Sequence, residues 1–233
     1  MDIIQHTNRL LSVLPAKSLT KLLIGAERVL LREPSRNEAF QNFSAGAYFP
    51  LSGILAIEMT LSNGATVEVG VVGREGVMMQ FDAVRATPAN RLIVRRSGVA
   101  LRVKLQHLFD LCLRDEALNQ LVHRRWASSL SVMSQLVACN RHHRIEQQLS
   151  RWLLDYLDHD DLFEVRITQE RIAAALGVRR EGVTESLGHL QQTGAIDIAR
   201  GALRVRDRPI LERVACECYP IIRDLRRSVP RAA

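Results

Sequence analysis

The stretch that most constrains the fold of this chain runs from Thr168 to Gly194, where two short helical patterns flank a glycine. Apolar residues at i, i+3 and i+4 predict one helix after Thr168, whose side-chain oxygen can accept a backbone N–H of the first turn. Gly177 can adopt the left-handed conformation that often ends a helix, and a second apolar pattern begins near Arg179. Two short helices joined by a glycine-containing turn are typical of a helix-turn-helix. The alternative is an ordinary helical hairpin with a solvated polar face.

A β-hairpin is predicted directly after this pair of helices. Residues 195–198 and 202–206 alternate apolar and polar side chains, with Arg200-Gly201 at the turn. A hairpin in this position is the wing of a winged helix, and its arginines can neutralise backbone phosphates. The second helix opens with basic residues, and recognition helices place their N-terminal residues against base edges. The wing arginines are Arg200, Arg204 and Arg206.

The charge of the chain is compatible with a nucleic-acid partner but does not identify one. The 233 residues carry a formal net charge of +7, and many basic proteins bind no polyanion. From residue 141 onward, arginines are nearly balanced by aspartates and glutamates. The prediction of DNA binding therefore rests on local clusters of arginine and not on net charge.

The N-terminal half has the pattern of an antiparallel β-domain preceded by helix. Residues 2–25 are helical in pattern, and from about residue 27 to 104 short β-type runs alternate with turns. Asn63-Gly64 favours a hairpin turn because this dipeptide accepts positive φ angles. Several short strands at regular spacing predict a sandwich or jelly roll. The candidate strands are 29–31, 47–50, 54–59, 66–72, 91–94 and 99–103.

A helical period returns at Leu105 and continues to about Leu157, with a polar hinge over 140–143. Apolar residues within it advance by three or four positions, which predicts a long helix with a continuous apolar stripe. Such a helix can pack on its own β-domain, or two copies can share the stripe in a homodimer, and we favour the homodimer. The predicted dimer-interface residues are Leu118, Val122, Trp126, Leu130, Met133 and Val137.

Together these patterns predict an α+β fold in three parts. An N-terminal antiparallel β-roll of the jelly-roll type, with a leading helix, is expected over 1–104. A long dimerisation helix is expected over 105–140, and a C-terminal winged helix-turn-helix over 141–233.

Cysteine use and hydropathy indicate a cytoplasmic protein. The cysteines are too few and too scattered for a disulfide framework, and the sequence shows neither a signal peptide nor a membrane span. Cys216-x-Cys218 lacks the C-x₂-C spacing of a zinc pair, and no second pair is evident. We therefore expect no metal, no cofactor and no membrane partner. The cysteines expected to be structural are Cys112, Cys139, Cys216 and Cys218.

Five local motifs agree with this order of parts. They are Tyr48–Gly53, Asn63–Gly70 and Val72–Gly76 in the roll, and Ile167–Glu170 and Gly177–Val183 in the helix-turn-helix. Together with the order of parts, they resemble the Crp/Fnr family of bacterial transcription regulators, relatives of the catabolite activator protein. The resemblance extends from about residue 10 to 220 and implies a homodimer that binds double-stranded DNA. It also implies that the roll is similar to a cyclic-nucleotide-binding domain.

The resemblance implies base-reading roles for Arg180 and Glu181, which match a family Arg-Glu pair. Arginine suits guanine O6 and N7, and a carboxylate can accept from cytosine N4. At the position of the next base-reading arginine of the family, this sequence has Glu185. Gly182 stands where the family usually has Thr or Ser, and we expect the glycine to allow a close approach of the helix to DNA. The operator of a relative therefore cannot be carried over. The predicted DNA-binding residues are Thr168, Gln169, Arg179, Arg180, Glu181, Thr184 and Arg200, of which Thr168, Gln169 and Arg200 are expected at phosphates.

The match weakens at the effector pocket. Cyclic-nucleotide binders of this family use a Gly-Glu pair for the ribose and an Arg-Ser or Arg-Thr pair for the phosphate, whose charge needs a fixed cation. In this sequence the position of that glutamate falls near Val77-Met78, and the position of the Arg-Ser pair falls near Ala89-Asn90. We therefore do not expect the chain to bind cyclic AMP. Another small molecule, or the chain's own side chains, would fill the pocket. The effector-pocket candidates are Gly76, Met78, Arg85, Ala89 and Asn90.

Other sensor chemistries and other classes of protein are less well supported. An iron–sulfur sensor of this family needs clustered cysteines near the N-terminus, and none precedes Cys112. A cupin enzyme needs histidines on its roll, but residues 7–106 contain none. A haem sensor needs an axial His or Cys in the roll or on the long helix, where His107 and His123 are expected to be surface or interface residues. No Walker A, H-E-x-x-H or G-x-S-x-G motif is present, so we expect no enzyme.

The remaining alternative is a regulatory protein that binds a cyclic nucleotide or another small molecule and acts on a protein partner. Such a protein would not need the arginines of the wing or the Arg-Glu start of the second helix. We therefore expect a homodimeric, sequence-specific DNA-binding transcription regulator. Its two recognition helices would enter successive major grooves about 34 Å apart.

Overall fold

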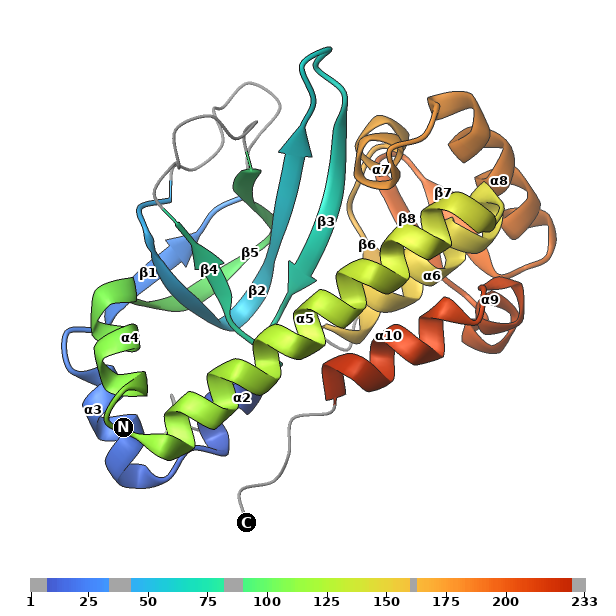
Figure 1. Ribbon diagram of the computed structural model, residues 1–233. Coiled ribbons are helices and arrows are strands. Elements are labelled where there is room, and N and C mark those ends of the chain that lie inside the picture. The colour runs from blue at the N-terminus through green and yellow to red at the C-terminus, as the bar shows by residue number, and fades with distance from the viewer. Residues whose placement is uncertain (1–7, 34–42, 82–89, 160–162, 228–233) are drawn as a thin grey trace.

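The computed structural model describes residues 8–33, 43–81, 90–159 and 163–227. An antiparallel sheet with strand order β1-β5-β2-β3, with β4 paired to β2, forms the roll (Figure 1). The predicted β-roll is confirmed. Its strands are β1 (Glu27–Leu31), β2 (Gly46–Thr60), β3 (Thr66–Val72), β4 (Met78–Gln80) and β5 (Asn90–Val103).

Two long strands replace four of the predicted short ones. β2 joins the predicted strands 47–50 and 54–59, and β5 joins 91–94 and 99–103. Their pairing shifts register between Pro50 and Leu55, and such irregularities bend a strand without ending it. A Cβ on Gly98 would lie 2.3 Å from the Ser52 carbonyl oxygen, so glycine is required where the two strands cross most closely.

Helices α2 (Arg9–Ser12), α3 (Ala16–Leu23) and α4 (Leu105–Cys112) pack beside the roll, and α5 (Glu116–His142) follows them. The single helix predicted over 105–140 is therefore two helices. Asp115 separates them because its carboxylate accepts from Leu118 N at 3.2 Å and so caps α5, and it also accepts from Ser18 Oγ at 3.0 Å. At 1.5 Å per residue, α5 is about 40 Å long.

The C-terminal half is a winged helix-turn-helix, as predicted, with a small sheet of order β6-β8-β7. Strand β6 and helix α10 were not predicted. Helix α10 runs beside α5 (Figure 1). The elements are α6 (Ile145–Asp158), β6 (Glu164–Val165), α7 (Gln169–Leu176), α8 (Arg180–Gln192), β7 (Ile196–Ala199), β8 (Ala202–Val205), α9 (Arg208–Val214) and α10 (Cys218–Arg227).

The two halves share a hydrophobic core. Ile54 of the roll is buried in the same cluster as Leu149 and Leu153 of α6. Trp152 Nε1 donates to Glu68 Oε1 of β3 at 3.2 Å, which satisfies a polar group buried at this contact. Within the described segments of the chain, no helix combines the length and apolar content needed to cross a membrane.

Candidate nucleic-acid interface

Helices α7 and α8 meet at the turn that the sequence predicts. Thr168 Oγ1 accepts from Arg171 N at 3.3 Å and caps α7. Gly177 ends α7 with φ +65°, a conformation that costs glycine little and other residues more. On α8, Val183, Leu187 and Leu190 are fully buried against the C-terminal core. This burial leaves the opposite face of α8 in contact with solvent.

Gly182 has a packing role that sequence analysis missed. A Cβ at this position would lie 2.6 Å from Ile145 Cδ1, so a side chain here would press on the first turn of α6. Close approach to DNA was the only reason that the sequence suggested. The short distance to the end of the Ile145 side chain adds a packing constraint at this position within the chain itself.

The exposed start of α8 presents the predicted base-reading side chains. Arg179, Arg180 and Glu181 are exposed, and none of them forms an ion pair with another described residue. Thr184 Oγ1 donates to Gln169 Oε1 at 2.8 Å, which fixes the α7 side chain against α8. Arg180 is thus an unpaired cation at a helix start, a position that suits contact with a base edge.

The wing is a two-stranded hairpin with Gly201 at φ +74°. Arg204 Nη2 lies 2.9 Å from Glu164 Oε2, and Arg206 is paired with Asp197. Arg200 is exposed and has no acidic partner in the described part of the chain. Two of the three wing arginines are therefore already neutralised, which the sequence did not indicate.

The helix-turn-helix and the wing enclose a common hollow. Its wall combines the start of α7, the start of α8 and the turn of the wing. Arg180 and Thr168 contribute a guanidinium and a hydroxyl to this wall, which also contains the Glu170 carboxylate. The lining residues include Thr168, Gln169, Arg180, Ala199 and Gly201.

The apolar stripe of α5 is divided between the chain's own core and its surface. Leu118 and Val122 are buried against the leading helices and the roll, so this part of the predicted interface is covered within one chain. Trp126, Leu130 and Val137 are 46%, 67% and 72% exposed, and Met133 is half-buried. Large apolar side chains exposed in one row on a helix often mark a protein contact.

A cavity of about 260 Å³ lies between the roll and α5. Met78 lines it, and neighbouring Gly76 is restricted because a Cβ there would lie 2.8 Å from Arg125 Nη2. Arg85 and Ala89 lie outside the described residues, and Asn90 is placed only as the first residue of β5. The wall is largely apolar: it includes Ile57, Val71, Val77, Met78, Met79, Trp126, Leu130, Val132 and Met133, with Ser128, Ser129, Arg125 and Arg226.

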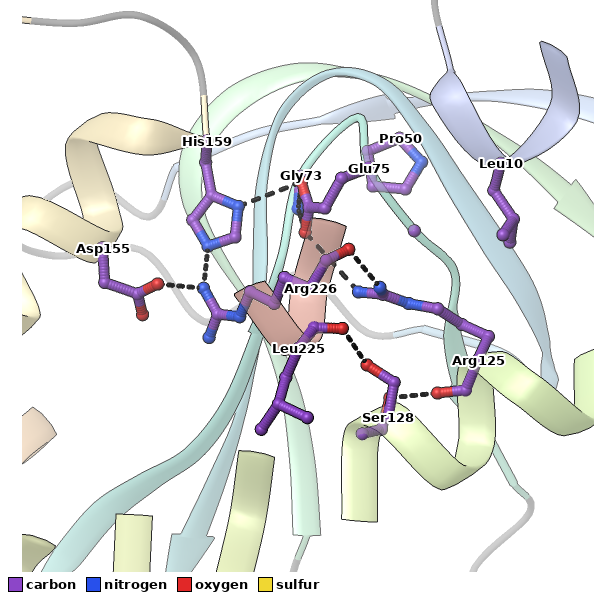
Figure 2. A network of polar contacts seen from close by, with 12 residues as sticks. Leu10, Pro50, Gly73, Glu75, Arg125, Ser128, Asp155, His159, Leu225 and Arg226 are labelled. Atoms are coloured by element: carbon purple, nitrogen blue, oxygen red, sulfur yellow. Dashed lines mark hydrogen bonds and ion pairs between the residues drawn. The ribbon is translucent and has the colours of Figure 1, made fainter. Parts of the chain in front are cut away.

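A buried polar network connects this cavity to the C-terminal half (Figure 2). Glu75, in the loop between β3 and β4, accepts from Gly73 N at 3.0 Å and contacts His159 Nδ1 at 3.0 Å and Arg125 Nη2 at 3.8 Å. Burial alone would raise the pKa of Glu75, but its contacts with His159 and the charges of Arg125 and Arg226 hold that pKa far below the ordinary value. Glu75, whose side chain is 12% exposed, is therefore a largely enclosed carboxylate that is ionised at neutral pH.

The same network fixes the end of α10. Arg226 donates to Asp155 and contacts His159 Nε2 at 2.6 Å. Arg125 Nη1 donates to the Arg226 carbonyl oxygen at 3.1 Å, and Ser128 Oγ donates to the Leu225 carbonyl oxygen at 2.6 Å. Figure 2 shows these side chains converging from α5, α6 and α10. Sequence analysis missed the network, although Glu75 lies within the Val72–Gly76 motif.

One group of described residues has the composition of a metal site. Cys139, His143, Cys216 and Cys218 lie between the end of α5 and the start of α10. In the sequence, Cys216 and Cys218 lacked a second pair of ligands. The fold supplies that pair as Cys139 and His143, which no spacing rule connects to them.

Comparisons with known proteins agree with this architecture. Residues 147–214 match the family model of the Crp-like helix-turn-helix domain. A protein from Eubacterium rectale assigned to the Crp/Fnr family of transcriptional regulators superposes with a TM-score of 0.66 at 15% identity, covering 88% of this chain and 96% of that one. No curated protein matches the sequence significantly.

Two further solved structures have the same fold. FixK2 from Bradyrhizobium japonicum gives a TM-score of 0.62 at 15% identity, covering 82% of this chain and 98% of that chain. The c-di-GMP responsive global regulator CLP from Xanthomonas campestris gives a TM-score of 0.61 at 15% identity, covering 83% of this chain and 100% of that chain. At these identities the matches establish the fold.

Proposed function

Since the chain carries a Crp-like helix-turn-helix domain within the fold of the Crp/Fnr transcription regulators, we propose that it is a homodimeric, sequence-specific DNA-binding regulator and not an enzyme. The observation that carries this proposal is the exposed, unpaired start of α8. Arg180 and Glu181 lie there, beside a wing whose Arg200 also has no ion-pair partner among the described residues. A guanidinium and a carboxylate at a helix start are suited to reading guanine and cytosine in the major groove.

The proposed homodimer is supported by the exposed part of α5. Trp126, Leu130 and Val137 would be buried between two copies of the helix. Burying a large apolar side chain contributes roughly 1.5–3 kcal/mol, which gives such a row a strong tendency to associate. In the dimer, the two α8 helices would read a near-palindromic site.

The cavity beside α5 supports a small-molecule effector of largely apolar character. Its described wall offers two arginines, Arg125 and Arg226, but these already contact Glu75 and Asp155. A cyclic phosphate would compete with these carboxylates for the cations. We therefore propose an effector other than cyclic AMP, which would act by shifting the population of two arrangements of α5 and the winged domain.

Selection from a random-duplex library tests the proposal. Full-length protein is incubated with the library alone, with cyclic AMP and with cyclic GMP, and the bound duplexes are sequenced. Enrichment of a two-fold symmetric site in the absence of nucleotide is expected. Enrichment only with a nucleotide would overturn the effector proposal. No enrichment under any condition would point either to a required effector that the assay lacks or to a regulator that acts on a protein partner.

A further inference from the structure

The group formed by Cys139, His143, Cys216 and Cys218 joins two parts of the chain that are distant in sequence. Cys139 and His143 are one helical turn apart at the end of α5, and Cys216 and Cys218 flank the start of α10. The three cysteines are buried, and His143 is half-buried. Cys139, Cys216 and Cys218 pack with Val132 and Ile222 in a small cluster of their own.

The distances between the potential ligand atoms suit one tetrahedral ion. Cys139 Sγ lies 3.5 Å from Cys216 Sγ, and Cys218 Sγ lies 3.6 Å from His143 Nδ1. All four ligand atoms lie within 4.8 Å of one another. Thiolates at about 2.3 Å from a tetrahedral zinc ion are about 3.8 Å apart, so only small adjustments are needed.

We propose that this group binds a single zinc-type divalent ion through the thiolates of Cys139, Cys216 and Cys218 and through His143 Nδ1. Three thiolates and one imidazole are a known structural zinc set. Soft thiolate ligands disfavour magnesium and calcium, which prefer oxygen. The proposal concerns metal binding alone and does not depend on the proposed function of the chain.

The second ring nitrogen of His143 supports the assignment. His143 Nε2 lies 3.1 Å from Glu217 Oε1, so the nitrogen that faces away from the thiolates has a carboxylate partner. Metal-bound histidines commonly donate their other N–H to a carboxylate, which fixes the ring and raises its basicity. Gln135 Nε2 also donates to Cys218 Sγ at 3.1 Å, as expected for an amide that stabilises a thiolate.

A buried cation beside the group also supports a bound metal ion. Arg151 is 3% exposed, and its Nε has no hydrogen-bond partner among the residues described. It lies near the Cys139 thiol. A divalent ion held by three thiolates leaves one net negative charge, which would compensate a guanidinium that otherwise lacks an ion-pair partner in this part of the chain.

Cobalt substitution provides the test. Reduced, metal-free, full-length protein is titrated with Co²⁺, and the thiolate-to-cobalt charge-transfer and tetrahedral d–d bands are recorded, followed by displacement with Zn²⁺. One equivalent per chain is expected to saturate both bands. Cys216→Ser and His143→Gln should weaken Zn²⁺ binding at least about 100-fold, and Glu217→Gln should weaken it roughly 10–100-fold.

Cys112→Ser is the matched control because Cys112 lies outside the group, and it should bind Zn²⁺ as the wild type does. Zn²⁺ should raise the melting temperature of the wild type and of this control but not that of His143→Gln. Octahedral cobalt spectra, equal loss in Cys112→Ser, or a Cys139–Cys216 disulfide with no metal uptake would overturn the proposal. If Cys216→Ser fails to fold, as judged by circular dichroism, the Zn²⁺ affinity of His143→Gln decides between the two outcomes.

Discussion

Single residues of the interface differ in what they can contribute to DNA binding. Within the part of the chain that the structure describes, Arg180 at the start of α8 and Arg200 at the tip of the wing have no ion-pair partner, whereas Arg204 is held by Glu164. The hydrogen bond from Arg204 also lowers the pKa of the Glu164 carboxyl. A contact to a base edge carries sequence preference, and a contact to a phosphate carries affinity alone.

Arg180→Ala is therefore expected to cost about 1–3 kcal/mol on the selected site and to relax base preference at one position of each half-site. Arg200→Ala should weaken specific and random duplexes alike and reduce the salt slope by about 1 per wing. Fluorescence anisotropy on both duplexes at several salt concentrations measures these effects. Equal losses on both duplexes for Arg180→Ala would contradict the base-reading role.

The negative charge of Glu75 stabilises the cationic side chains of the buried network. Its pKa is held below the ordinary value by neighbouring His159, Arg125 and Arg226. The ionised form therefore contributes stability that is present above the unfolded-state pKa and is lost as pH falls toward the lower folded-state pKa.

Glu75→Gln is expected to lower the free energy of unfolding by about 3 kcal/mol at pH 7 because it removes the carboxylate partner of the buried Arg125 guanidinium. The difference from the wild type should shrink as pH falls below the unfolded carboxyl pKa of about 4.3. Urea unfolding at a series of pH values measures it. Glu185→Gln, an exposed change on α8, should give no such pH-dependent difference, and a constant deficit for Glu75→Gln would exclude the ionised role.

Among the elements, α5 has two different apolar surfaces. Its first turns pack on α4 and the leading helices, and its middle exposes Trp126 and Leu130. The sequence pattern predicted one continuous stripe because periodicity records which side chains share a face and not what covers them. The packing of α2 and α3 against Leu118 and Val122 depends on contacts that no local pattern contains.

Leu130→Glu is expected to convert the proposed dimer into monomers, since it places a charge in the middle of the shared apolar surface. Sedimentation velocity across a range of concentrations measures the change. Leu113→Glu is the matched control: Leu113 is 86% exposed but lies in the break before α5. A dimer that survives Leu130→Glu, or one that is lost equally in Leu113→Glu, would contradict this interface.

Helix α10 shows why a terminal element escaped prediction. Pro220 lies in its first turn, where the missing N–H removes no hydrogen bond, but a proline by itself does not mark a helix start in sequence. The long-range contacts could not be predicted either. Cys139 and Cys216 are separated by 77 positions, and Glu75 and His159 by 84. By contrast, Thr168 and Gly177 set the ends of α7 through local backbone chemistry, which is why their roles were predictable.

At the level of the whole molecule, the shared core predicts that the two halves unfold together. Ile54 and Val71 of the roll pack with α6, and Tyr156 Oη donates to the Arg95 carbonyl oxygen at 3.0 Å. Contacts of this kind make the stability of each half depend on the other. A single cooperative transition is then expected in place of two.

The two tryptophans report on two different helices, Trp126 on α5 and Trp152 on α6 at the contact with β3. Trp152→Phe leaves Trp126 on α5, and Trp126→Phe leaves Trp152 on α6. In urea, the fluorescence midpoint of each variant should coincide with its own circular dichroism midpoint. A fluorescence transition that precedes the helical transition in the same protein would show that the halves unfold independently.

The same contact limits how this chain can diversify in evolution. Gly177 closes α7 directly against Val67 of β3, where an added Cβ would lie 3.2 Å from Val67 Cγ2. A substitution on this side of α7 or on α6 would therefore require a compensating substitution in the sheet. The start of α8 and the tip of the wing face solvent and are free of this constraint. In the proposed regulator, new operators would be acquired by changes at those tips, whereas a winged domain transplanted from a distant relative would have to bring a matching β3 with it.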